Sequence, residues 1–164
     1  MSTGREKQAR EEKKLARVRF EATKLDAAQR NIHVLAGIAS VTNFLLLLCD
    51  LFFIREQTQR LIIGVLRYCF SILLILMALR LQRIKTFSGF SAVVSILEAL
   101  AILLFLSILQ LYDSPNFMIQ SMGILLTILI VFVVPNRWEN MLALSIIASV
   151  AYFLYAYYRI PNLP

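Results

Sequence analysis

Five long apolar stretches follow one another along the chain, and they cover residues 34–54, 61–81, 89–111, 118–134 and 141–158. Each is about long enough to cross a hydrocarbon core of roughly 30 Å as a helix that rises 1.5 Å per residue. The chain is 59% hydrophobic, with a mean hydropathy of +0.72, which is more apolar than a soluble domain of this length. The sequence therefore predicts an all-α polytopic membrane protein with a bundle of five transmembrane helices.

Residues 1–33 differ sharply from the rest, because they hold nine of the 17 basic residues and five acidic ones. Thr3 and Glu6 resemble a capping box, and the segment is predicted to be a charged amphipathic helix in the cytoplasm. An apolar stripe with alternating spacings of three and four residues runs along it, interrupted by Gln29. Its members are Leu15, Val18, Ala22, Leu25 and Ile32. The stripe fits either a short coiled coil that dimerises the protein or a helix that lies on anionic lipid or the inner loops.

The distribution of positive charge predicts the orientation. With a cytoplasmic N-terminus, thirteen Lys and Arg residues lie on the inner side and three on the outer side, while Arg67 falls within the second stretch. We therefore expect an inner-membrane protein of a bacterium with the short tail 159–164 outside. The net charge of +7 is explained by this topology, so we expect the lipid bilayer, and no nucleic acid, as a partner.

The residues that carry most enzyme chemistry are scarce. His33 is the only histidine, and Cys49 and Cys69 both lie within apolar stretches, where thiols behave as small apolar residues. A disulfide between them is the less favoured alternative. The short connections lack nucleophile–base pairs and phosphate-binding glycines. We therefore expect no enzyme activity, no metal and no cofactor.

The connections themselves carry turn and interface residues. Pro115 and Pro135 fall where helices should end, and Asp113, Asn116 and Asn136 favour turns. Aromatic side chains near the ends of the apolar stretches are typical of the membrane–water interface. We expect six of them there, namely Tyr112, Trp138, Tyr152, Tyr155, Tyr157 and Tyr158.

Charged groups are costly inside hydrocarbon, so Asp50 and Arg67 should be paired. The two residues lie at nearly equal depth on neighbouring antiparallel helices, which predicts an ion pair. Such a pair is either a structural link near the interface, with Arg67 reaching outward, or one wall of an outward-facing ligand pocket. The structural link is the favoured alternative.

Glu98 falls near the middle of the third stretch. Loss of water disfavours its charged form, so we expect a protonated, hydrogen-bonded carboxyl unless Arg67 reaches it. Asn43, at similar depth in the first stretch, is a candidate partner. Ser91, Ser95 and Ala99 form a face of small residues beside Glu98 that would allow close helix packing.

Four segments resemble the six-helix membrane input regions that precede bacterial nucleotide cyclases and GGDEF-type diguanylate cyclases. They are LLCDLFFI at 47–54, GVLRYCF at 64–70, SGFSAVVSILEAL at 88–100 and PNRWENMLALSIIASVAYFL at 135–154. The likeness spans roughly residues 28–158, but a sixth helix and a catalytic domain are missing. The resemblance implies an input region truncated before its sixth helix.

The resemblance implies a non-catalytic membrane sensor or anchor module. Such a module would regulate a cyclase-type signalling output through helix packing, as a homodimer or with a partner membrane or signalling protein. Two alternatives stay open. A lone intramembrane Glu98 is compatible with a small transporter or transporter subunit, although the middle of the helices lacks the Gly and Pro that broken helices need. A structural subunit of a larger membrane complex would require no polar pathway.

Overall fold

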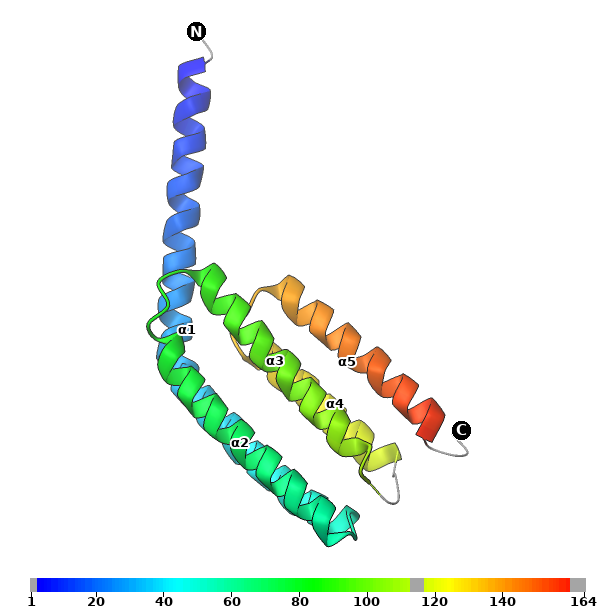
Figure 1. Ribbon diagram of the computed structural model, residues 1–164. Coiled ribbons are helices and arrows are strands. Elements are labelled where there is room, and N and C mark those ends of the chain that lie inside the picture. Colours follow the sequence, from blue (N-terminus) through cyan, green and yellow to red (C-terminus); the bar gives the residue numbers. More distant parts are fainter. Residues whose placement is uncertain (1–2, 113–116, 160–164) are drawn as a thin grey trace.

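The computed structural model describes residues 3–112 and 117–159, and its regular elements are five α-helices (Figure 1). They are α1 (Thr3–Phe53), α2 (Gln57–Leu81), α3 (Phe87–Leu109), α4 (Phe117–Val133) and α5 (Trp138–Arg159). The prediction of an all-α chain with five helices is confirmed. The predicted turn residues Asp113, Pro115 and Asn116, and the tail from residue 160, lie outside the described residues.

Within the described residues, four helices, α1, α2, α3 and α5, are long and apolar enough to span a membrane. The fourth apolar stretch is the exception. Helix α4 has 17 residues, which give it a length of about 25 Å at 1.5 Å per residue. It is therefore shorter than a typical hydrocarbon core of roughly 30 Å.

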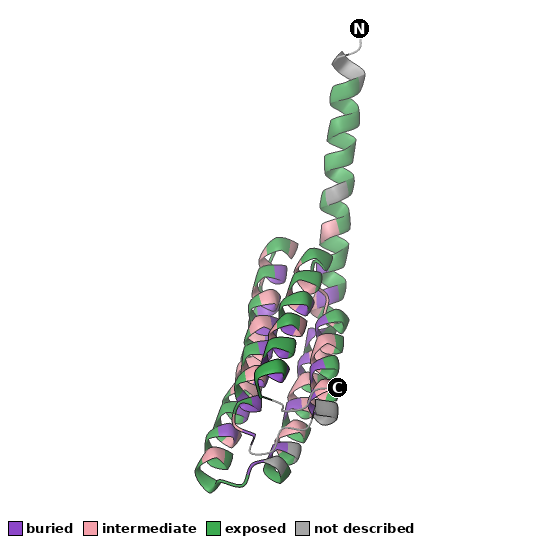
Figure 2. Ribbon diagram, turned by 90° about the vertical axis from the view of Figure 1, so that its right-hand side faces the viewer, coloured by how far each residue is buried: buried purple, intermediate pink, exposed green. Residues whose placement is uncertain are grey.

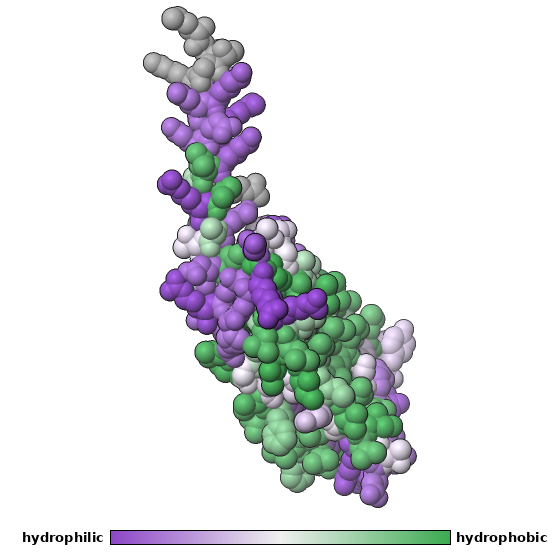
Figure 3. Space-filling model, turned by 60° about the vertical axis from the view of Figure 1, so that its left-hand side comes forward, coloured by the Kyte–Doolittle hydropathy of each residue, from purple (hydrophilic) through white to green (hydrophobic). Residues whose placement is uncertain are grey.

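The first 33 residues and the first apolar stretch form one uninterrupted helix of 51 residues. Between Gly4 and Gly37 the sequence has no Gly or Pro, so nothing in it breaks the backbone hydrogen bonding. The N-terminal part of α1 projects from the bundle (Figure 1). It is hydrophilic over most of the surface visible in Figure 3, whereas the face of the bundle seen there is largely apolar between its two ends.

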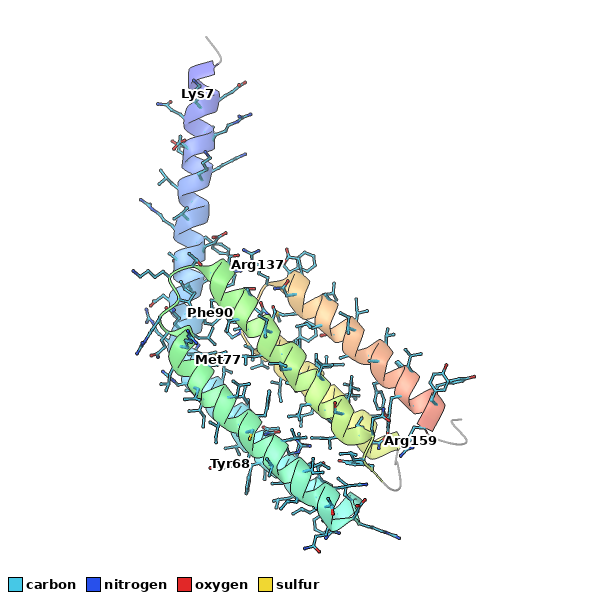
Figure 4. The ribbon with its side chains drawn as sticks, viewed as in Figure 1. Lys7, Tyr68, Met77, Phe90, Arg137 and Arg159 are labelled. Carbon is cyan, nitrogen blue, oxygen red and sulfur yellow. The ribbon has the colours of Figure 1, made fainter. Side chains whose placement is uncertain are left out.

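We call the end of the bundle from which α1 projects the proximal end; it carries the connections 82–86 and 134–137. The distal end carries the connection 54–56 and the end of α3. In Figure 4, Arg137 lies toward the proximal end and Arg159 lies at the distal end.

Helices α1 and α2 form a closely packed antiparallel hairpin, and α3 contacts all four other helices. Two apolar clusters make the core. One, around Phe90, Leu81 and Ile32, is proximal, and the other, around Phe105 and Tyr152, is nearer the distal end. Buried residues line the facing sides of the helices (Figure 2). Large apolar side chains cover much of the outside, as expected for a surface in contact with lipid.

The apolar stripe of α1 divides into two parts at the proximal end of the bundle. Leu25 and Ile32 are buried against the other helices, whereas Leu15 and Val18 are 57% and 64% exposed. Gln29, which interrupts the stripe, donates from Nε2 to the carbonyl oxygens of three residues at and beyond the end of α2. These carbonyls lack partners within their own helix. Gln29 thus caps α2, and the uncovered stripe is limited to Leu15, Val18 and Ala22.

One prediction about side chains on the bundle needs correction. Tyr112, Tyr152 and Tyr155 are buried, because their hydroxyl groups bond to groups inside the bundle, whereas Trp138, Tyr157 and Tyr158 are exposed as expected. Cys69 is a free, exposed thiol, so the disulfide that was the less favoured alternative does not form. The side chain of Cys49 lies outside the part that the structure describes.

Candidate functional site

The structure contains the ion pair that the sequence predicts between α1 and α2. Arg67 Nε lies 2.5 Å from Asp50 Oδ2, and the two residues are 4% and 1% exposed. The Arg67 carbonyl is bonded to Asn43, whereas its Nε is bonded to Asp50, which lies nearer the distal end of α1, so the side chain extends toward that end while it stays buried. Buried charges of this kind are tolerated when they are paired and their remaining hydrogen-bonding groups are satisfied.

Asn43 and Tyr112 complete this polar cluster, which we call the distal cluster. Asn43 Oδ1 accepts from Arg67 Nη1 at 2.8 Å, and Asn43 Nδ2 donates to the Arg67 carbonyl at 2.8 Å and to Ser71 Oγ at 2.9 Å. Tyr112 Oη donates to Asp50 Oδ1 at 2.6 Å. Both carboxylate oxygens of Asp50 are therefore bonded, and the cluster joins α1, α2 and the segment that follows α3.

Glu98 belongs to a second group of polar residues, the proximal cluster. Asn136 Nδ2 donates to Glu98 Oε2 at 2.7 Å and to Ser95 Oγ at 3.0 Å, and Ser91 Oγ donates to Asn136 Oδ1 at 2.5 Å. Asn140 Nδ2 also donates to Ser95 Oγ at 2.9 Å. The predicted partners of Glu98 were wrong, because Asn43 and Arg67 are bonded to each other. The partner is Asn136, which the sequence marked only as a turn residue.

The short helix α4 explains how a turn residue reaches Glu98. Asn136 follows α4 directly, whereas Ser95 and Glu98 lie two to three turns inside α3. The contacts therefore place the connection between α4 and α5 roughly 12 Å along the α3 axis from its first residue. The sequence feature that indicates this position of the α4–α5 connection is the length of the fourth apolar stretch, which is the shortest of the five.

Asn43, Arg67 and Glu98 also line one cavity of about 130 Å³ between the α1–α2 hairpin and helices α3 and α4. Its proximal rim includes Ile32, Leu81 and Val134, and most of the remaining lining is apolar. Glu98 is 6% exposed, and its Oε1 has no hydrogen-bond partner among the described residues. Buried polar atoms are nearly always bonded, so this oxygen requires an explanation.

Within the described residues, no three His, Cys, Asp or Glu side chains come together as metal ligands would. The clusters hold carboxyl, amide, guanidinium and hydroxyl groups, which can bind and orient polar ligand groups. Neither cluster joins a nucleophile to a general base. The expectations of no metal, no cofactor and no enzyme activity stay predictions.

The proximal cluster leads to a prediction about stability. Glu98→Gln should change the melting temperature in mild detergent little, because the amide oxygen can still accept from Asn136. Glu98→Ala should cost about 1–3 kcal/mol, because it removes that acceptor and leaves space beside the cavity. Thermal unfolding of both variants measures the difference. Equal losses would mean that the carboxyl group itself, in its charged form, is required.

Comparisons with protein-family models, with curated proteins and with solved structures give no match.

Proposed function

We propose that this chain is a multi-pass sensor module of the bacterial inner membrane, which regulates a cyclase-type signalling output through helix packing. The observation that carries the proposal is the continuity of α1. One half of this helix supplies Asn43 and Asp50 to the distal cluster, and the other half projects beyond the bundle. A rigid helix of this kind converts a change in packing inside the membrane into a displacement of its far end.

The exposed stripe offers a means of reading that displacement. Leu15, Val18 and Ala22 lie on one face of the projecting part of α1, and no other described helix covers them. Two such helices from two copies would bury these residues along a common seam. A homodimer whose α1 helices approach or separate is therefore the favoured arrangement, and a helix of a partner signalling protein is the other.

The proposed orientation has the N-terminus in the cytoplasm. Alkaline phosphatase is active only outside the inner membrane, so its fusion after Pro164 should be active and its fusion after Lys85 inactive. The excess of basic residues on the proximal connections and α1 supports this result. The opposite pattern of activities would contradict the topology and the sensor function together.

The signalling role can be tested with a DNA-binding reporter that works only as a dimer, fused ahead of Met1 in the full chain. Val18→Glu should lower the reporter output about tenfold, the effect of losing about 1.4 kcal/mol of association free energy. Phe20→Glu is the matched control, because Phe20 is 60% exposed and lies on the opposite face of α1.

Asn43→Ala should also lower the output at an unchanged amount of membrane protein. Asn43 holds α1 against Arg67 and Ser71 of α2, so its loss should move α1 relative to the bundle. If neither Val18→Glu nor Asn43→Ala changed the output, the sensor proposal would fail and a structural subunit would be the better account.

A small transporter, or transporter subunit, is the second candidate function. The observation that favours it is Glu98 Oε1, which has no partner among the described residues and belongs to a residue that lines the cavity, because intramembrane carboxyl groups can carry protons or cations. On either proposal we expect the purified chain to turn over neither ATP nor GTP.

A further inference from the structure

The cavity between the α1–α2 hairpin and helices α3 and α4 combines an apolar lining with one carboxyl oxygen that has no partner among the described residues. We propose that it binds a hydrophobic ammonium ion, with the alkyl part in the cavity and the ammonium group on Glu98 Oε1. Only the signalling consequence of binding rests on the proposed sensing function. The binding site itself follows from the geometry.

The electrostatics of the lining favour a cation. Arg67 and Glu98 are the charged residues that line the cavity, and the charge of Arg67 is offset by Asp50. Glu98 has no cationic partner among the described residues, and Asn136 satisfies only its Oε2. An ammonium group donates up to three hydrogen bonds and supplies the missing charge. The bound cation would favour the charged form of Glu98, whereas a carboxylate ligand would offer it no opposite charge.

The size and shape of the cavity favour a short alkyl chain. Its volume is about 130 Å³, close to that of an apolar cavity of about 150 Å³ that takes up benzene in another protein. It extends from Ile32 and Leu81 at the proximal rim to Asn43 and Leu46, along α1. A chain that lies along this direction contacts Ala36 and Ala39, where small side chains leave the space open.

Three unbranched probes with the same number of carbon atoms separate the effect of charge from that of hydrophobicity, namely n-octylamine, n-octanol and octanoate. Their binding is measured with the full chain in nanodiscs, after subtraction of uptake by empty nanodiscs of the same lipid. We expect saturable binding of octylamine that is at least about tenfold tighter than that of octanol, which corresponds to about 1.4 kcal/mol. Octanoate should show no saturable binding.

Glu98→Gln should abolish the preference for octylamine over octanol, because the amide keeps the shape of the site without its charge. The matched control is Glu139→Gln, which removes an exposed carboxyl at the start of α5, outside the cavity lining. Ala101→Phe, which fills the cavity, should weaken binding of octylamine and octanol alike. Equal octylamine binding by the parent chain and Glu98→Gln would overturn the proposal, as would equally tight binding of octanoate.

Measurements with the same probes distinguish a failure of the proposed ligand site from a failure of the proposed sensing function. Octylamine binding without any change in the α1 reporter would support the site and contradict its role in sensing. A reporter that responds to Val18→Glu and Asn43→Ala, with no saturable octylamine binding, would support sensing and overturn the ligand site. Uptake of octylamine into proteoliposomes that requires Glu98 would support the site and favour the transporter.

Discussion

Arg67→Ala is expected to destabilise the folded chain by about 3–5 kcal/mol, the cost of leaving a buried charge without its partner. Asp50 is 1% exposed, and removal of Arg67 would leave its carboxylate with the Tyr112 hydroxyl as its remaining side-chain partner in the distal cluster. Thermal or denaturant-induced unfolding in mild detergent measures the loss. Arg83→Ala is the matched control, because Arg83 is an exposed arginine in the connection between α2 and α3 and should cost less than about 0.5 kcal/mol.

The double variant Asp50→Ala with Arg67→Ala tests whether the two side chains interact or contribute independently to the free energy of unfolding. When both charges are removed, neither remains unpaired, so the double change should cost clearly less than the sum of the two single changes. Additive losses would show that the two side chains do not interact in the folded protein. They would also remove the link that the proposed function needs between α1 and α2.

The ion pair was predictable because depth in a membrane is counted along the sequence. From the predicted bounds of the apolar stretches, Asp50 and Arg67 lie at nearly equal depth on neighbouring antiparallel helices. In the structure α2 already begins at Gln57, so the backbone of Arg67 lies deeper, beside Asn43, and its long side chain spans the distance to Asp50. The same count could not identify Tyr112 as a member of the distal cluster. Tyrosine suits both the membrane interface and buried hydrogen bonds, and only the packing of α3 against the hairpin decides between them.

Glu98 was predictable as a buried polar residue, but its partner was not. That partner depends on where α4 ends, since Asn136 reaches Glu98 only because α4 is short and its connection lies deep in the bundle. The capping role of Gln29 could not be predicted from the sequence for a related reason. A polar residue in an apolar stripe is read as an interruption until the carbonyl groups that it caps are known.

Gly123→Ala is expected to destabilise the chain by about 1–3 kcal/mol, the usual cost of overpacking a filled interior. A Cβ atom at position 123 would lie 2.8 Å from Phe105 Cζ and 2.9 Å from Phe105 Cε2. Phe105 is 8% exposed and belongs to the distal apolar cluster, and its ring relieves the clash only if it leaves this packing and moves toward the cavity that it lines. The close approach of α4 to α3 therefore depends on the absence of a side chain at position 123.

Gly64→Ala on α2 is the matched control for this prediction. Apart from the adjacent residues and the nearby backbone of α2 itself, no atom of the described residues lies within 4 Å of a Cβ built at position 64, so alanine there should be neutral or should stabilise the helix by up to about 1 kcal/mol. Unfolding of both variants in the same detergent gives the comparison, and equal shifts would contradict the close contact between α3 and α4.

Phe105→Leu should recover part of the stability that Gly123→Ala loses, because a smaller side chain removes the clash. Phe105 also lines the cavity, so the double variant should bind octanol differently from the parent chain, whereas Gly64→Ala should not.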